Sequence, residues 1–267
     1  MTMRLKIRHT THYTFDEPVF FGMQQLRETP KSRDAQKVLN WQTDITGGIR
    51  QLSFEDHFLN TVEMITYDRG TTELSITSHG EVEVTDTNGV TGKHLGPAPL
   101  WLFKRPTKRT RAGSGIKKLA RQAEGETSIA RMHSLMAIIG ETVSYEVGAS
   151  EPTWSAEEAL TEGKGVCQDH AHIFIACARE LDLPARYVSG YLMMDDTIEQ
   201  DAMHAWAEVY LDNIGWVGFD VSNGICPDPR YVRVATGLDY SDAAPVTGTR
   251  MGGEAESLSV QIEVAQQ

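Results

Sequence analysis

The sequence has few cysteines, no long apolar run and fewer basic than acidic residues. Its 267 residues include three widely spaced cysteines, which do not make a disulfide framework and would leave one unpaired. No stretch approaches the length of a membrane span, and the first residues lack the apolar core of a signal peptide. We therefore expect a cytoplasmic protein with no membrane partner. The formal net charge of −12 also argues against a nucleic-acid partner.

Apolar residues make up 40% of the chain, which is enough to form a substantial hydrophobic core. Over the first hundred residues, apolar and polar side chains alternate as in β-strands, for example from Leu5 to Ile7 and from Tyr13 to Phe15. Glycine-containing turns such as 47–48 and 88–89 separate these strands. The pattern predicts an N-terminal antiparallel β-sandwich-like domain over residues 1–98.

A Pro- and Lys/Arg-rich segment, residues 99–112, follows, and we expect it to be a solvated linker. Residues 113–267 are predicted to form the second domain. Apolar periodicity indicates helices near 116–123 and 129–143, and Ser155 with Glu158 has the spacing of a capping box. The alternating tail, 258–264, predicts a last strand that either returns to the N-terminal sheet or edges the second one.

Cys167 is predicted to begin a helix. Gly163 and Gly165 break the chain just before it, and apolar residues then recur at helical spacing until Pro184 stops the helix near Asp182. At a helix start, unpaired N–H groups and the helix dipole favour a thiolate over a thiol. The N–H of Cys167 itself would lie where a tetrahedral oxyanion develops.

His204 and Asp220 are predicted to lie on neighbouring strands, because residues 203–210 and 215–220 both alternate. A hairpin loop over Leu211-Asp212-Asn213 would make Tyr210 face Ile214 and His204 face Asp220. A register two residues different would leave His204 and Asp220 diagonal neighbours on one face. Asp220 would then hold one ring nitrogen of His204 while the other faces Cys167, as a catalytic triad requires.

Each of these three residues also has an ordinary structural interpretation. A cysteine at a helix start can be a small core residue, a strand histidine can be structural, and an aspartate at a strand end can begin a turn. Their joint order favours a nucleophilic thiol site at Cys167, His204 and Asp220. Cys177, within the helix, is expected to be packed, and Cys226 lies in a loop.

The chain resembles the bacterial transglutaminase-like cysteine proteases. Segments of the core that carry the resemblance, in family order, are 165–169 (Gly-Val-Cys-Gln-Asp), 184–191 (Pro-Ala-Arg-Tyr-Val-Ser-Gly-Tyr) and 204–206 (His-Ala-Trp). Outside the core, the resemblance is carried near the start of the chain by residues 4–9 together with Tyr13 and Pro18. Near the end of the chain it is carried by residues 237–240 and 244–246. The resemblance implies an α+β fold, with a papain-like core behind the family's N-terminal β-domain. It also implies a Cys–His–Asp triad at Cys167, His204 and Asp220.

One motif departs from the family pattern. Residues 220–223 read Asp-Val-Ser-Asn, whereas the family more often has Asp-Pro-Thr-Asn. Val221 therefore replaces a rigid turn residue beside Asp220. The substitution leaves the carboxylate in place.

These residues predict a thiol-dependent acyl-transfer enzyme. Cys167 would attack an amide carbonyl to form a thioester, and His204 would protonate the leaving amine. Hydrolysis of peptide or isopeptide bonds is favoured because water is abundant. Transglutaminase-type cross-linking would need a groove that excludes water, and no sequence pattern indicates one. We expect a peptide or protein substrate, no cofactor and no metal.

Two other classes of protein are alternatives. Cys167, Asp169, His170 and His172 cluster in the manner of metal ligands, but His172 points away from the face that Cys167 and His170 share. A non-catalytic binding module with a relict cleft is the other alternative, and the intact Cys, His and Asp set argues against it.

Three further residues on the predicted His204 face have structural interpretations. Trp206 and Trp216 are expected to pack beside the site rather than to shape an acyl-binding cleft. Glu208 is expected to pair with Arg186 on the preceding strand.

Overall fold

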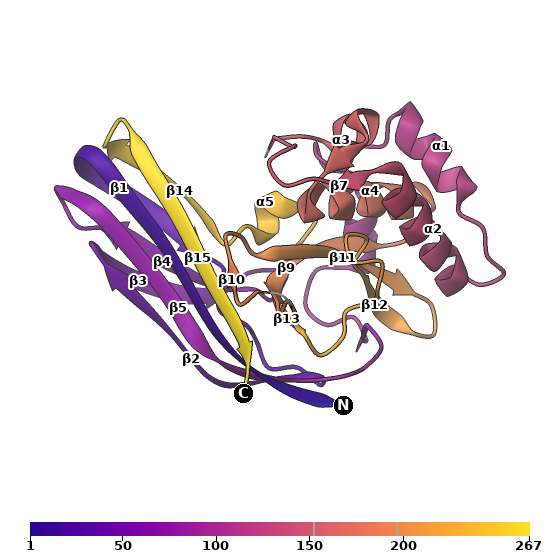
Figure 1. Ribbon diagram of the computed structural model, residues 1–267, viewed down its shortest axis with the longest axis horizontal. Helices are drawn as coiled ribbons and strands as arrows, with labels where there is room; N and C mark the ends of the chain where they lie inside the picture. The colour runs from indigo at the N-terminus through magenta and orange to yellow at the C-terminus, as the bar shows by residue number, and fades with distance from the viewer. Residues whose placement is uncertain (152, 196) are drawn as a thin grey trace.

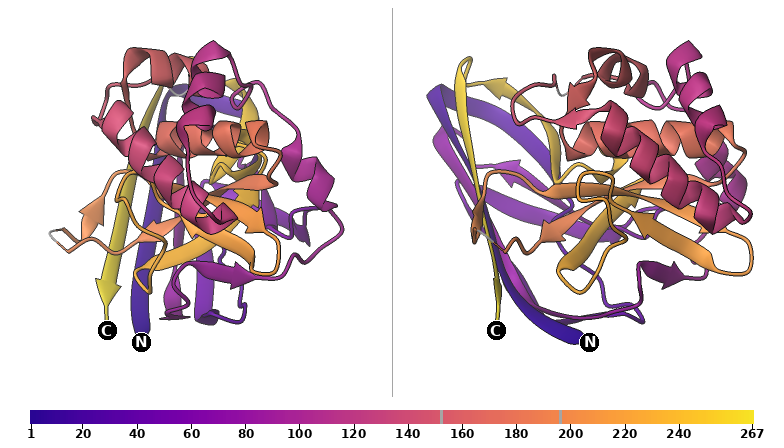
Figure 2. Two further views of the ribbon diagram at one scale, coloured as in Figure 1. Left: turned by 90° about the vertical axis from the view of Figure 1, so that its right-hand side faces the viewer. Right: turned by 45° about the vertical axis from the view of Figure 1, so that its right-hand side comes forward.

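The computed structural model describes residues 1–151, 153–195 and 197–267 and has the predicted α+β class. Figure 1 shows a broad antiparallel sheet, built from the N-terminal strands and the yellow C-terminal strands. Beside it lies a second sheet whose upper face is covered by helices. The N- and C-termini lie close together at one end of the broad sheet, as both views of Figure 2 also show.

The elements of the N-terminal part are β1 (Thr2–Leu26), β2 (Gln36–Thr46), β3 (Gly48–Glu55), β4 (Thr61–Tyr67), β5 (Thr71–Thr85), β6 (Val90–Gly92) and the 3-10 helix η1 (Leu100–Lys104). Those that follow are α1 (Ser114–Gln122), α2 (Ser128–Thr142), β7 (Ser144–Tyr145), α3 (Ala156–Glu162), β8 (Lys164–Gly165), α4 (Cys167–Glu180), β9 (Ala185–Leu192) and β10 (Glu199–Gln200). The last are β11 (His204–Leu211), β12 (Gly215–Phe219), β13 (Tyr231–Gly237), α5 (Tyr240–Ala243), β14 (Val246–Gly252) and β15 (Glu256–Gln266).

The long strand β1 organises the first sheet. Its first part pairs with β5 and β15, and its last part pairs with β4 and β14. A register shift near Val19 separates the two parts. Apolar side chains from both parts form one cluster, in which Phe15 contacts Tyr67 of β4 with ring centroids 5.9 Å apart. These strands form one large antiparallel sheet, with an apolar cluster that joins the two parts of β1.

The two C-terminal strands both belong to this first sheet. β15 pairs with β1 from Phe15↔Glu256 to Leu5↔Gln266, and β14 pairs with the end of β1. Of the two positions predicted for the tail strand, the structure shows the return to the N-terminal sheet. The chain therefore begins and ends in the same sheet.

The second sheet has the strand order β13-β9-β11-β12-β6. Helix α4 packs against β11 and β9, and α1, α2 and α3 pack around α4. Because α4 is covered on all sides, it is apolar well beyond one stripe: Ile173, Phe174 and Ile175 are all fully buried. This central helix carries Cys167 at its first position.

The predicted domain boundaries do not follow the sheets strictly. β6 lies within residues 1–98 but pairs with β12 of the second sheet. The segment predicted as a solvated linker is partly buried, since Phe103 and Thr110 are 2% and 1% exposed. Arg179 of α4 fixes this segment by donating hydrogen bonds to the Phe103 carbonyl and to Thr110 Oγ1. The division at residues 98 and 113 stays a prediction.

The local predictions for the helices agree with the structure. α1, α2 and α4 lie where apolar periodicity indicated, and Ser155 and Glu158 form the capping box at the start of α3. Gly163 ends α3 in the left-handed conformation, with φ +68°. Among the described residues, no helix has both the length and the apolar character needed to cross a membrane.

The two sheets meet at a polar and aromatic contact. Tyr191 of β9 lies 6.0 Å from Trp41 of β2, measured between ring centroids, and its hydroxyl is 3.1 Å from Nδ1 of His9 on β1. All three side chains are buried or half-buried. The first sheet is thereby held against the part of the second sheet that leads to His204.

Candidate active site

Cys167 is positioned by the short segment that joins α3 to α4. β8 pairs with β7 in parallel, and the N–H of Glu146 donates to the Gly165 carbonyl at 2.9 Å. Asp169 then accepts a hydrogen bond from the Val166 N–H at 2.9 Å, which closes the first turn of the helix. As the first residue of α4, Cys167 presents its backbone N–H where no acceptor within the helix is available. Its side chain is half-buried.

The hairpin that carries His204 and Asp220 differs from the predicted register by two residues. Tyr210 pairs with Trp216, not with Ile214, because the turn occupies residues 212–214. Asn213 does adopt the predicted left-handed conformation, with φ +68°. His204 and Asp220 are therefore diagonal on one face, which is the second of the two predicted geometries. They still meet: His204 Nε2 lies 2.7 Å from Asp220 Oδ2.

The Asp220 carboxylate is 1% exposed and is surrounded by donors. Its Oδ2 accepts from the Tyr231 hydroxyl at 2.7 Å and from Asn223 Nδ2 at 2.6 Å. Its Oδ1 accepts from the backbone N–H groups of Ser222 and Asn223. Burial raises the pKa of Asp220, but the hydrogen bond and charge of His204, with these donors, outweigh it, so the pKa lies below its ordinary value.

His204 is held in its charged form by its two partners. Burial lowers its pKa, but hydrogen bonds to Asp220 and to Cys167 and the charges of both residues raise it to about 10. Since Nε2 faces Asp220, Nδ1 is the ring nitrogen left for Cys167. The structure thus brings together all three residues that the sequence singled out, with the imidazole between the thiol and the carboxylate.

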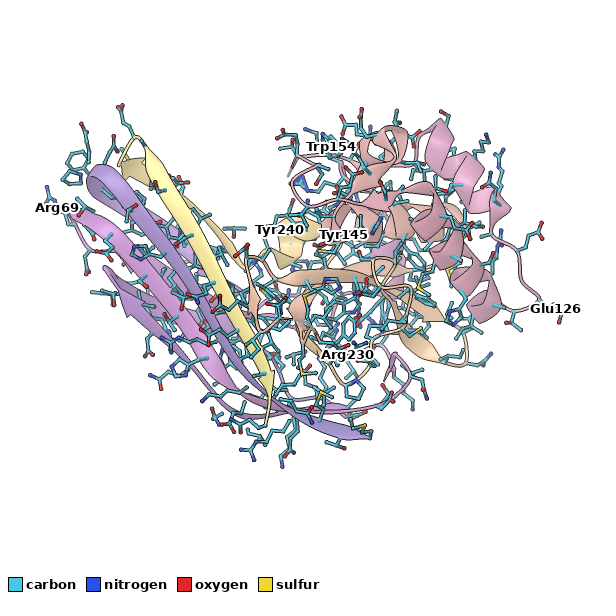
Figure 3. The ribbon with its side chains drawn as sticks, viewed as in Figure 1. Arg69, Glu126, Tyr145, Trp154, Arg230 and Tyr240 are labelled. Carbon is cyan, nitrogen blue, oxygen red and sulfur yellow. The ribbon has the colours of Figure 1, made fainter. Side chains whose placement is uncertain are left out.

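A cleft of about 280 Å³ opens beside Cys167 and His204. Gln168, Tyr187 and Tyr240 contribute to one wall, which belongs to the helix-bearing part of the molecule. The facing wall comes from the first sheet: Tyr13 of β1 and Val260 of β15 lie there. Figure 3 shows Tyr145 and Tyr240 on the side of the second sheet that carries the helices, near the opening between the two parts of the fold.

Two family models match the chain. The model described as the bacterial transglutaminase-like N-terminal region matches residues 5–83, and that of the transglutaminase-like superfamily core matches residues 117–221. A transglutaminase-like core and a bacterial transglutaminase-like N-terminal region are thus both present in the chain. The core match contains Cys167, His204 and Asp220, so the thiol site lies inside the transglutaminase-like core.

The chain is similar to curated mycobacterial proteins and to a solved structure. An uncharacterized protein of Mycobacterium leprae is 27% identical over 98% of both chains. An uncharacterized protein of Mycobacterium tuberculosis is 39% identical over 39% of this chain and 37% of its own length. A crystal structure described as a candidate cysteine protease from Cytophaga hutchinsonii superposes with a TM-score of 0.79 and 22% identity, covering 100% of this chain and 91% of that one. The whole fold is therefore shared with that protein.

Sequence reasoning missed two residues of the candidate site. Tyr231 and Asn223 both hydrogen-bond to Asp220 Oδ2, yet neither was singled out. Asn223 had a signal, since it follows Asp220 at the i+3 spacing of the Asp-Val-Ser-Asn turn. Tyr231 had none, because β13 reaches Asp220 through sheet pairing with β9 that no local pattern encodes.

Asp169, His170 and His172, which were considered above as metal ligands, each form hydrogen bonds with different protein groups. Asp169 caps α4, His170 lies between the Val143 carbonyl and Ser222 Oγ, and His172 Nε2 accepts the Tyr240 N–H. Burial lowers the pKa of both histidines. Within residues 1–151, 153–195 and 197–267, no group of three such side chains is arranged to hold a metal ion.

The remaining predicted side chains have structural contacts. Trp216 is buried among aromatic rings, and Trp206 lies under the imidazole of His204 with centroids 6.2 Å apart. Glu208 pairs with Arg186, as predicted, and also with Arg233. Cys177 is buried, and Cys226 is half-buried.

Proposed function

We propose that this protein is a cysteine peptidase or amidase that hydrolyses peptide or isopeptide bonds through a thioester on Cys167. The observation that carries the proposal is the imidazole of His204, held between Asp220 and Cys167 at the edge of an open cleft, and its raised pKa agrees with this arrangement. An imidazolium beside a cysteine favours the thiolate, which is the attacking form. The shared fold with the candidate cysteine protease of Cytophaga hutchinsonii supports an enzyme.

In the acylation step, the Cys167 sulfur attacks the amide carbonyl carbon. The S–C bond forms as the carbonyl electrons move to oxygen, and the N–H of Cys167 at the start of α4 stabilises the oxyanion. The His204 imidazolium then donates its Nδ1 proton to the leaving nitrogen, and the C–N bond breaks. A thioester and a free amine result.

In the deacylation step, neutral His204 takes a proton from water as the water oxygen attacks the thioester. The tetrahedral intermediate expels the Cys167 thiolate and releases a carboxylic acid. Asp220, fixed by Tyr231 and Asn223, keeps Nε2 of His204 protonated and Nδ1 directed at the reacting atoms. No group besides water is needed.

The alkylation rate of Cys167 tests the proposed thiolate. Iodoacetamide should label Cys167 rapidly even near pH 6, and His204→Ala should slow this labelling at pH 6 by about tenfold or more, as a thiolate that loses its partner would. Mass spectrometry of the labelled peptide gives the rate at each pH. Equal rates in both proteins would reject the thiolate–imidazolium pair.

A second measurement separates hydrolysis from cross-linking. A peptide substrate identified by turnover is incubated with added methylamine, and the products are weighed by mass spectrometry. Hydrolysis gives the acid, whereas acyl transfer to the amine gives the methylamide. The expected product is the acid, and Cys167→Ala should form neither.

A further inference from the structure

The last strand, β15, has an unpaired edge beside the candidate active site. On one side it pairs with β1 along its whole length, from Glu256 to Gln266. On the other side, β10 (Figure 1) pairs with it at Ile262 and Glu263 and no further toward Glu256. In the part of the chain that the structure describes, no other strand pairs with β15. Residues 256–261 therefore form a sheet edge without a partner strand on this side.

The register of β15 determines which backbone groups point to this edge. The Val264 N–H donates to the Ile198 carbonyl next to β10, whereas the Gln267 N–H donates to β1. Backbone N–H and C=O groups alternate in direction along a strand, and the pairing of β15 with β1 has no register shift. The N–H and carbonyl groups of Leu258 and Val260 therefore point away from β1, to the unpaired edge.

The side chains of the same two residues line the cleft at Cys167. Leu258 is 54% exposed, and Val260 is half-buried. The residues that join β10 to β11, 201–203, also line the cleft and lead directly to His204. A strand that followed β10 along β15 would therefore enter the cleft.

This edge lacks the features that usually protect a sheet edge. Soluble proteins protect their edge strands with charged side chains, proline or β-bulges. Residues 256–261 contain no proline and one charged residue, Glu256, whose carboxylate is paired with Arg250 at 2.7 Å. The continuous pairing with β1 leaves no bulge that would turn the edge away. The edge is therefore able to accept a further strand.

We propose that an extended segment of the substrate chain pairs with the edge of β15 at Leu258 and Val260 and is thereby led past Cys167. This pairing rests on the proposed hydrolysis, and it narrows the substrate to an extended peptide segment, as opposed to a folded loop or a small amide. In strand addition, main-chain hydrogen bonds supply affinity, and pockets for alternate side chains supply specificity. The apolar wall at Leu258 and Val260 favours apolar side chains at the alternate positions that face the cleft.

Labelling of Cys167 by peptide reagents tests the pairing. A chloroacetyl group is attached to the tetrapeptide Val-Thr-Val-Thr, either at its N-terminus or, through ethylenediamine, at its C-terminus. Mass spectrometry gives each labelling rate, which is divided by the rate with chloroacetamide. One of the two peptide reagents should exceed chloroacetamide by at least about tenfold, because it is held by main-chain hydrogen bonds. All three reagents meet the same sulfur, so the ratio is independent of how strongly the thiol is activated.

N-Methylation of the faster reagent separates strand pairing from docking of side chains. Alternate N–H groups of a paired peptide point to β15, so methylation at every second residue should lower the ratio by about tenfold. Methylation at the intervening residues should change it by less than about twofold. Equal effects at all four residues, or a ratio near one for both reagents, would overturn the proposal. Fast labelling by chloroacetamide near pH 6 would in that case leave the proposed hydrolysis standing.

Two substitutions of Leu258 test the protein side of the pairing. Leu258→Pro removes the N–H at the unpaired edge but no bond to β1, and proline is tolerated at such positions of edge strands. It should lower the ratio by about tenfold, whereas Leu258→Ala keeps the N–H and should lower it by less than about threefold. Equal ratios in the two variants would contradict the pairing. If the proline variant does not fold, the N-methylated reagents with the native protein decide.

A second copy of the chain is the other possible occupant of this edge. Analytical ultracentrifugation of the native protein and of Leu258→Pro distinguishes it from substrate. The native protein is expected to have the same oligomeric state as the variant. A native dimer that Leu258→Pro dissociates would assign the edge to a second copy and overturn the proposal.

Discussion

At the scale of single residues, His204 determines how the site responds to pH. Its pKa is about 10 in the folded protein against an ordinary value of 6.5, because burial, which lowers the pKa, is outweighed by Asp220 and Cys167. A histidine whose pKa is raised on folding stabilises the fold fully below pH 6.5 and loses that contribution as the pH rises to about 10. The protein should therefore lose stability across this range.

Urea unfolding at pH 6.5, 8 and 9.5 checks this expectation. His204→Gln serves as the reference, because glutamine keeps a polar side chain but does not titrate. The free energy of unfolding of the native protein should fall toward that of the variant as the pH rises. Parallel pH dependence in the two proteins would show that His204 is not held in its charged form.

Tyr231 gives a second prediction at this scale. Its hydroxyl donates to the buried Oδ2 of Asp220 at 2.7 Å. Tyr231→Phe removes a hydrogen bond to a charged group and should lower the free energy of unfolding by about 1.5–3 kcal/mol. Denaturant unfolding measures the loss. Tyr210→Phe, on a half-buried strand tyrosine with no bond to Asp220, is the control and should cost less.

At the scale of elements, the start of α4 depends on a glycine. A Cβ at Gly165 would lie 2.7 Å from Cβ of Asp169, the residue whose carboxylate caps the helix. Gly165→Ala should therefore displace the first turn, lower the free energy of unfolding by about 1–3 kcal/mol and slow alkylation of Cys167 several-fold. Thermal unfolding and labelling rates measure both effects.

Gly140 provides a matched control within α2. A Cβ there meets nothing closer than the Val221 carbonyl oxygen at 3.8 Å. Gly140→Ala should leave labelling unchanged and stabilise the protein by up to about 1 kcal/mol, because alanine favours the helix. If both alanine variants labelled Cys167 at the native rate, the tight contact at Gly165 would have no part in placing the thiol.

The features that were predicted correctly are those that depend on local sequence patterns. Apolar periodicity located α4, and the glycines that precede it located its start, so the position of Cys167 at the head of the helix follows from the amino-acid sequence alone. The hairpin register was predicted two residues off, because Asn213 and Gly215 both adopt left-handed conformations and shift the turn. His204 and Asp220 tolerated that error, since a shift of two keeps both side chains on one face.

At the scale of the whole molecule, the pairing of the chain ends was the least predictable feature. β15 lies against β1 although the two strands are at opposite ends of the sequence, and alternation alone cannot name a partner strand. The consequence reaches the candidate active site. Because of that pairing, Tyr13 and Val260 form the wall of the cleft that faces Cys167. The first sheet is thus part of the cleft as well as a neighbour of the core.

This arrangement predicts that β15 limits what can reach Cys167. Val260→Trp would enlarge a half-buried side chain in the facing wall without touching His204 or Asp220. Labelling by iodoacetamide should stay within about twofold of the native rate, whereas labelling by a bulky fluorescein iodoacetamide should slow by about tenfold. Gln261→Trp places the same ring on the exposed face of β15 and should change neither rate. If the large reagent reacted equally with both variants, substrate would approach Cys167 without passing the first sheet, and that sheet would only support the core.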